Sequence, residues 1–155
     1  MQVAKVCTGW GYANATPGAT ANANLFRGSP ANYIEPMMLW PAFHDDTAKT
    51  IVGGRVLPAG QDGMKDLKDT LDALFEHPTT GPFIARQLIQ RLVTSNPSPG
   101  YIYRVARAFA NNGAGVRGDL AAVVRALLLD YEARSPDVAA TATFGKLKEP
   151  LLRAT

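Results

Sequence analysis

The amino-acid sequence predicts a mostly α-helical fold, with about four antiparallel-packed helices and an irregular N-terminal half that contains a short β-hairpin. Two observations carry this prediction. Up to about Gly63 the chain is rich in Gly, Pro, Ala and Asn and shows little periodicity, whereas from Asp62 onward apolar residues recur at helical spacing. The links between successive helices are also short, which favours antiparallel neighbours.

The N-terminal half holds one predicted loop and one predicted hairpin. The stretch GYANATPGATANANLFRGSPANY, residues 11–33, has the composition of a long loop. Two short β-prone runs lie within Thr50–Pro58, on either side of Gly53-Gly54, and such a glycine pair suits a tight turn. We therefore expect the hairpin at residues 50–58.

The first two helices follow from capping residues and spacing. Asp62 is a suitable N-cap, and the first helix ends at His77-Pro78 because the residue before a proline avoids the helical region. The second helix begins at about Pro82, a favourable first-turn residue, and stops near SNPSPG, residues 95–100. The apolar residues that repeat along the first helix are Met64, Leu67, Leu71, Leu74 and Phe75.

Two further helices are predicted in the same way. Ser98-Pro99 begins the third, and Asn112-Gly113 is its exit. Asp119 caps the fourth, which ends before Ser135-Pro136, and another helical start covers residues 149–153. The broad apolar stripe of the fourth helix consists of Leu120, Val123, Val124, Leu127 and Leu128.

The bulk properties describe one domain of 155 residues, in which we expect residues 1–63 to form a loop-rich segment with the small hairpin and residues 64–155 the helical part. The net charge of +3, from 16 basic and 13 acidic side chains, is too mild to indicate nucleic-acid binding. No apolar run approaches the ~20 residues that span a bilayer. The N-terminus lacks the regions of a signal peptide, and Cys7 is the only cysteine, which excludes an internal disulfide.

Five ordered motifs resemble a bacterial family called domain of unknown function 1800. LDALFEHPTTGPFIARQLIQRLV resembles the family's helix ending in His-Pro and its FIAxKLxxxFV helix, and GDLAAVVRALLLDYEAR resembles its DLxxVxRAxLxxxEx segment. GKLKEP resembles its closing GKxKxP. Upstream, CTGW at residues 7–10 is similar to the family's LTGW, and FHDDTAKTIVGG at residues 43–54 is similar to its HDxGxKTxLG.

The resemblance implies a fold and motif positions but no mechanism, because the family has no established activity. Its members are far longer than this chain, so we expect a C-terminal portion truncated at both ends, which lacks the helical part before LTGW and stops inside a helix, or a short open reading frame from such a gene. Family members are often exported from bacteria, yet the compartment of this chain stays open. Loss of the upstream part is expected to expose apolar helix faces, so the partners we expect are a second copy of the chain or that missing part.

A His-Asp cluster is the first candidate site. His44, Asp45 and Asp46 are adjacent, and His77 is the only other histidine. Imidazole and carboxylate groups suit a divalent metal or proton transfer, and a hairpin folded back on the first helix would bring His44 and His77 together. The candidate metal ligands are therefore His44, Asp45 and His77. In the alternative interpretation, an aspartate caps a turn and His77 holds a helix end.

An aromatic and carboxylate surface is the second candidate. Asp45, Asp46 and Glu35 are candidate catalytic carboxylates, because glycoside hydrolysis needs an acid and a base or nucleophile. The candidate carbohydrate-binding platforms are Trp10, Trp40 and Tyr33. The alternative is that these rings anchor a loop without regular structure.

The sequence therefore favours a binding or assembly module of a bacterial protein, with metal binding through the His-Asp cluster as one form of it. The cofactor is unknown, with a divalent metal as the candidate. The competing prediction is a hydrolase acting on a carbohydrate through the same carboxylates. Serine chemistry is not indicated, because no G-x-S-x-G motif occurs, and no phosphate-binding glycine loop has the required spacing.

Overall fold

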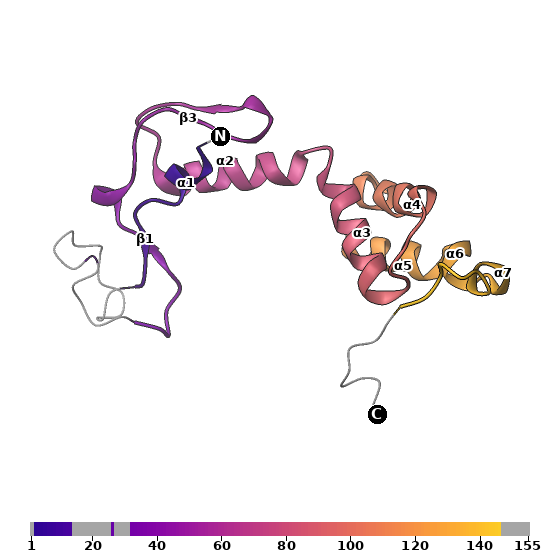
Figure 1. The fold of residues 1–155 in the computed structure, drawn as a ribbon. Helices are drawn as coiled ribbons and strands as arrows, with labels where there is room; N and C mark the ends of the chain where they lie inside the picture. Colours follow the sequence, from indigo (N-terminus) through magenta and orange to yellow (C-terminus); the bar gives the residue numbers. More distant parts are fainter. Residues whose placement is uncertain (1, 14–25, 27–31, 147–155) are drawn as a thin grey trace. The chain divides into compact units, whose positions relative to one another are not determined.

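The structure, a computed structural model, describes residues 2–13, 26 and 32–146 (Figure 1). The chain divides into two compact units, residues 1–77 and 78–155. Most of the predicted loop at residues 11–33 and all of the predicted helical start at 149–153 lie outside the described residues. The described part confirms a mostly α fold with four long helices and a small hairpin in the N-terminal half.

Unit 1 combines short elements with one long helix. Its helical elements are α1 (Val3–Val6), η2 (Pro41–Phe43), η3 (Val52–Gly54) and α2 (Gly63–Glu76), and its strands are β1 (Trp10–Gly11), β2 (Met38–Leu39), β3 (Lys49–Thr50) and β4 (Val56–Leu57). Strands β3 and β4 pair antiparallel around Gly53 and Gly54, both at positive φ, which confirms the predicted hairpin. Strands β1 and β2 form a second antiparallel pair that the sequence analysis did not anticipate.

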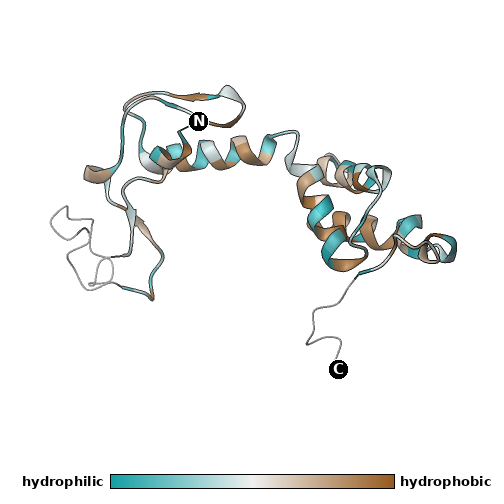
Figure 2. Cartoon of the chain, viewed as in Figure 1, coloured by the Kyte–Doolittle hydropathy of each residue, from teal (hydrophilic) through white to brown (hydrophobic). Residues whose placement is uncertain are grey.

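Helix α2 begins as predicted, with the Asp62 carboxylate accepting hydrogen bonds from the backbone N–H groups of Met64 and Lys65. Its burial pattern differs from its apolar repeat, because the helix buries Gly63, Asp66 and Thr70, and Leu67 is the one member of the repeat that packs against the core. Apolar and polar residues alternate along this helix (Figure 2). The exposed apolar side chains of α2 are Met64, Leu71, Leu74 and Phe75.

The small core of unit 1 consists of Val6, Ile51 and Leu57, with Leu67 of α2 packed against it. Among the described residues this cluster has three buried apolar side chains, so its apolar burial contributes limited stability. Polar contacts therefore hold α1, the hairpin and α2 together to an unusual extent, and the candidate site is built from those contacts.

Unit 2 is a helical assembly of α3 (Thr80–Leu92), α4 (Pro99–Ala110), α5 (Leu120–Leu129), α6 (Tyr131–Arg134) and α7 (Pro136–Ala139). Ser98 and Asp119 cap α4 and α5 as predicted. Helices α3, α4 and α5 pack on one another around one apolar core. The buried residues of that core are Ala85, Ile89, Tyr101, Val105, Ala106, Phe109, Val123 and Leu127.

Two helix boundaries differ from the prediction. Helix α3 begins at Thr80, two residues before Pro82. Helix α5 ends at Leu129 instead of continuing towards Ser135, because the Asp130 carboxylate caps α6 by accepting the N–H of Glu132. The same carboxylate binds Arg104 of α4 through two hydrogen bonds of 2.7 and 2.8 Å. This contact between α4 and the α5–α6 junction fixes the break in the helix.

Within the described residues, no helix is long and apolar enough to cross a membrane.

Candidate functional site

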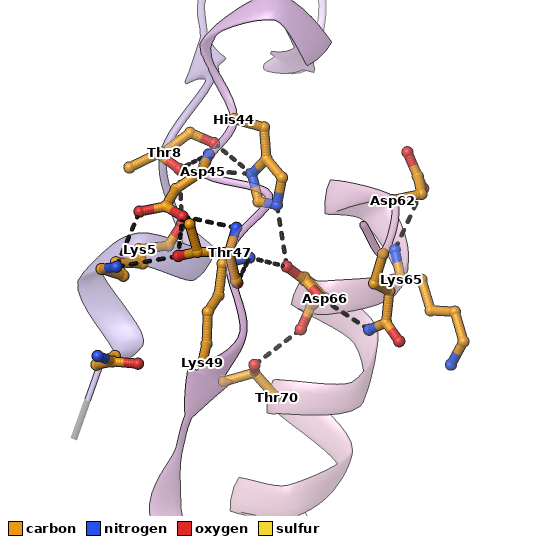
Figure 3. A network of polar contacts seen from close by, with 12 residues as sticks. Lys5, Thr8, His44, Asp45, Thr47, Lys49, Asp62, Lys65, Asp66 and Thr70 are labelled. Carbon is orange, nitrogen blue, oxygen red and sulfur yellow. Dashed lines mark hydrogen bonds and ion pairs between the residues drawn. The ribbon is translucent and has the colours of Figure 1, made fainter. Parts of the chain in front are cut away.

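A buried ion pair lies at the centre of unit 1 (Figure 3). The Lys49 Nζ atom of β3 is 2.7 Å from Asp66 Oδ2 of α2, and neither side chain is exposed to solvent. His44 Nε2 lies 3.0 Å from the same Asp66 oxygen, and the His44 side chain is 5% exposed. One carboxylate oxygen of Asp66 therefore contacts the side chains of both Lys49 and His44, which come from two other segments of the chain.

The remaining acceptors of Asp66 are also occupied. Gln61 Nε2 donates to Asp66 Oδ1 at 2.7 Å, and the Thr70 hydroxyl donates to the Asp66 backbone carbonyl at 2.7 Å. Burial by itself raises the pKa of Asp66, but hydrogen bonds from Lys49 and His44 and the charge of Lys49 outweigh it, so the pKa lies below its ordinary value. Asp66 is therefore an ionised acceptor at neutral pH.

The other side of the His44 ring faces the turn after α1. His44 Nδ1 is 3.0 Å from the Thr8 backbone carbonyl and 3.5 Å from the Thr8 hydroxyl. That hydroxyl donates to the Lys5 carbonyl at 2.6 Å and accepts the backbone N–H of Asp45 at 2.8 Å. The Thr8 residue thus joins α1 to the segment that carries His44.

Asp45 stabilises a turn through its side chain. Its Oδ1 atom accepts the backbone N–H of Thr47 at 2.9 Å and the Thr47 hydroxyl, while Lys5 Nζ lies 3.2 Å from Oδ2. The Thr47 hydrogen bonds, with a smaller contribution from Lys5, lower the pKa of Asp45 to about 2. Both carboxylate oxygens are engaged, which matches the turn-capping interpretation considered from the sequence.

Two glycines allow the backbone to approach this closely. Gly9 has φ of +77°, and a Cβ atom there would lie 2.8 Å from the Trp40 carbonyl and 2.9 Å from the His44 nitrogen. A Cβ atom on Gly63 would lie 3.0 Å from the His44 ring. The first turn of α2 and the turn after α1 can therefore enclose His44 only because these positions lack side chains.

A pocket of about 490 Å³ opens beside His44. Asp46 lines this pocket, and its carboxylate has no hydrogen-bond or ion-pair partner among the described residues. Asp62 also lines it while capping α2, and the Gln61 amide nitrogen is used by Asp66 and Asp69. The full lining is Leu39, Pro41, Ala42, His44, Asp46, Gly60, Gln61, Asp62 and Gly63.

The predicted aromatic platforms occupy different environments. Trp40 is 3% exposed, packs against Phe26 at a ring distance of 5.6 Å, and donates its indole N–H to the Tyr12 carbonyl at 3.3 Å. Tyr33 is exposed and meets Tyr12 edge to face at 5.0 Å. Trp10 is half-buried, and its indole nitrogen has no partner within the described part of the chain. None of these three rings lines the pocket.

The candidate carboxylates and histidines are also separated. Glu35 lies in the segment before β2, where its backbone N–H donates to Asn32, and it does not line the pocket. His77 follows the last residue of α2, whereas His44 contacts the first, so about 20 Å of helix separates them. In residues 2–13, 26 and 32–146, no group of three His, Cys, Asp or Glu side chains is placed to hold a metal ion.

The family described as "Protein of unknown function (DUF1800)" matches residues 1–155, the whole chain. The chain belongs to the DUF1800 family. Among curated proteins and among solved structures, no match is found.

The contacts around His44 are contacts between motifs of the DUF1800 family. Two of the motifs through which the chain resembles the family, at residues 7–10 and 43–54, meet there: Thr8 and Gly9 of the first contact His44 and Asp45 of the second. The first two residues of the closing GKxKxP motif also make contacts: Gly145 exchanges hydrogen bonds with Thr94, and Lys146 donates to the Arg91 carbonyl.

The site residues predicted from the sequence do not include Lys49, Gln61 or Asp66. Lys49 is the lysine of the HDxGxKT family motif, and this position in the motif was the sequence signal that could have identified it. Asp66 gave none, because it lies on the side of α2 opposite the apolar repeat, where a carboxylate normally faces solvent.

Proposed function

We propose that this chain is a binding module whose ligand occupies the pocket at the start of α2. The observation that carries the proposal is the Asp46 carboxylate, which lines the pocket and has no partner among the described residues. The neighbouring polar side chains of His44, Gln61 and Asp62, by contrast, have hydrogen-bond partners in the chain. A pocket with a few oriented polar groups beside an apolar wall is the usual form of a small-molecule site.

The polar groups of the pocket favour a ligand rich in hydrogen-bond donors. Asp46 and Asp62 present carboxylate oxygens, and Gln61 has only its carbonyl oxygen left, because its amide nitrogen donates to Asp66 and Asp69. Leu39, Pro41 and Ala42 supply the apolar wall. A sugar, with hydroxyl donors around an apolar ring face, fits this combination best.

Binding of a divalent metal is a separate form of the proposal, and this geometry gives it little support. Both nitrogens of His44 face other groups, both oxygens of Asp45 are engaged, and His77 lies at the far end of α2. Elemental analysis of the purified chain, with and without chelator, tests it directly. Metal near one equivalent per chain would support that form.

The binding proposal is tested by ligand screening with matched variants. A panel of mono- and disaccharides is titrated against ¹⁵N-labelled chain, and amide shifts are followed at residues 41–46 and 60–63. Asp46→Asn is expected to weaken binding at least tenfold. Asp137→Asn, an exposed carboxylate of unit 2, is the control and leaves the affinity unchanged. Shifts spread evenly over both units, or equal affinities of the two variants, contradict the proposal.

A hydrolase is the alternative use of the same pocket, and one observation supports it: Asp46 and Asp62 line one pocket. Paired carboxylates are the requirement of glycoside hydrolysis. The alternative predicts turnover of a reporter glycoside with a bell-shaped pH profile, abolished in Asp46→Asn. Binding without turnover supports the binding module.

Self-association is the assembly part of the proposal. Helix α5 is apolar on several faces, yet it buries only Val123 and Leu127, while Leu120, Leu128 and Leu129 are exposed. A helix that is apolar all round is normally enclosed. Sedimentation over a hundredfold range of concentration is expected to show a dimer or larger species, which Leu128→Glu weakens.

A further inference from the structure

We propose that helix α2 pairs with the α2 helix of a second copy of this chain, in antiparallel orientation. The surface that carries this pairing lies on the side of α2 opposite the buried Asp66. We call it the α2 seam, and it consists of Met64, Lys68, Leu71 and Phe75. The seam lies outside the pocket and in unit 1, whereas the exposed leucines of α5 lie in unit 2, so this interface is independent of both.

The seam has the spacing of paired helices. Its members follow one another at intervals of four, three and four residues, which places them on one side of the helix. Met64, Leu71 and Phe75 are 55%, 55% and 44% exposed, although each is a large apolar side chain. Exposed apolar residues gathered in one stripe mark an interaction surface, and a stripe with this repeat fits a second helix.

The charges beside the seam select the antiparallel orientation. Lys65 and Asp72 are seven residues apart and lie on the same edge of the seam, one towards each end of α2. When two copies of a helix lie antiparallel, the same edges meet in reversed order, so Lys65 of each copy faces Asp72 of the other. In a parallel pair this edge would face the other edge, which carries Leu67 and Leu74, and the opposite charges would not meet.

The antiparallel register also accounts for the one polar member of the seam. With the two helices centred on each other, Met64 lies against Phe75 of the second copy, a favourable contact between a thioether and an aromatic ring. Lys68 lies against Leu71 of the second copy. The Lys68 side chain is 73% exposed and is paired with Asp72 of its own helix, so it can also reach Asp72 of the second copy. A single lysine within such a seam fixes the register at a cost in stability.

The order of charges along α2 is unfavourable for the helix by itself. Lys65 and Lys68 precede their partners Asp69 and Asp72 by four residues, which is the less stabilising order of an ion pair on a helix. The macrodipole favours basic groups near the end of a helix, yet α2 has none in its last turn. An antiparallel second copy brings basic groups beside this end. The order that is poor in one helix is therefore complementary between two.

Sedimentation of the full chain over a hundredfold range of concentration tests the seam. Leu128→Glu is present in every variant, so that α5 does not contribute, and the native chain is run beside them. We expect dimers in this background, and Leu71→Glu is expected to raise their dissociation constant about tenfold or more. Leu92→Glu is the control, because Leu92 of α3 is 54% exposed and Leu71 is 55% exposed. The control leaves the dissociation constant unchanged.

The possible outcomes separate the two interfaces. If the native chain dimerises and Leu128→Glu is monomeric, the α2 pairing is overturned and the α5 interface stands. If Leu128→Glu has no effect and Leu71→Glu abolishes the dimer, the reverse holds. Equal effects of Leu71→Glu and Leu92→Glu overturn the α2 pairing. A native chain that is monomeric over the whole range overturns both interfaces and leaves unit 2 of the same chain as the candidate cover of the seam.

Exchange of charges tests the orientation. Lys65→Asp makes the charged edge acidic and Asp72→Lys makes it basic, so each variant alone is expected to lose association through repulsion between like charges. An equimolar mixture of the two is expected to restore it, because an acidic edge then meets a basic one. Restoration in the mixture also excludes unfolding as the cause of the loss. Charge variants that associate as strongly as the background, or a mixture of folded variants that stays monomeric, overturn the antiparallel pairing.

Discussion

Lys49 and Asp66 form an ion pair of 2.7 Å in which neither side chain is exposed to solvent. The pair joins strand β3 to helix α2 beside a cluster that has three buried apolar residues in the described part of the chain. The ion pair therefore links these two elements in the way that a larger apolar core does in other small domains. A buried pair of this kind stabilises a fold only while both partners and their hydrogen bonds are present.

Removal of one partner is expected to be costly. Lys49→Met leaves Asp66 buried with its main counter-ion gone, and we expect a loss of about 3–5 kcal/mol in the free energy of unfolding of unit 1. Both tryptophans lie in this unit, so urea unfolding followed by tryptophan fluorescence measures it. Lys65→Met, which breaks the exposed ion pair with Asp69, is the control and costs about 0.5 kcal/mol or less. Similar losses in the two variants would contradict the role assigned to Lys49.

Acid should weaken the turn held by Asp45. The folded-state pKa of Asp45 is about 2, below its ordinary value of 3.8, because of the Thr47 hydrogen bonds. The stabilisation is therefore complete above about pH 4 and is lost as the pH falls towards 2. Asp45→Asn is expected to be less stable than the native chain at pH 5 and to show a shallower loss between pH 4 and pH 2. Asp46→Asn, which removes an unpaired neighbour, should keep the native slope.

Both the caps and the hairpin could be predicted because their causes are local. Asp62, Ser98 and Asp119 accept backbone N–H groups two or three residues away, and Gly53-Gly54 turns the chain within one tight loop. These features need no knowledge of the rest of the fold.

Long-range contacts decided the features that the sequence did not reveal. Strand β1 pairs with β2 although 26 residues lie between them, and no pattern in either dipeptide indicates that partner. Helix α2 buries Asp66 because Lys49 and His44 bind its carboxylate, although the apolar repeat of the helix favours burial of the opposite face. His44 could be singled out as unusual from the sequence alone. Its partners could not, because Thr8 lies in the turn after α1 and Asp66 lies in α2, both far from His44 in the sequence.

In unit 2, the Tyr101 hydroxyl donates to the Leu127 carbonyl at 2.6 Å. Tyr101→Phe leaves that buried carbonyl without this donor, so we expect a loss of about 1–2 kcal/mol in the stability of unit 2. Burial raises the pKa of Tyr101 to about 12, so between pH 10 and pH 12 the folded state keeps a proton that the unfolded state releases. Stability followed by circular dichroism should fall over this window in the native chain but less in Tyr101→Phe. Tyr103→Phe, at an exposed tyrosine, is the control for both effects.

The last prediction concerns the close approach at Gly9. A left-handed backbone costs a residue with a side chain about 1–2 kcal/mol, and Gly53→Ala, at φ of +70° in open space, should cost that much and no more. Gly9→Ala adds a Cβ atom within 2.9 Å of the Trp40 carbonyl and the His44 backbone nitrogen, so its loss should be clearly larger. Because these neighbours are backbone atoms, the strain would displace the segment that carries His44. We therefore expect Gly9→Ala, and not Gly53→Ala, to shift the His44 ring resonances in the folded state. Equal losses and unchanged ring signals in both variants would show that the turn after α1 does not set the position of the histidine.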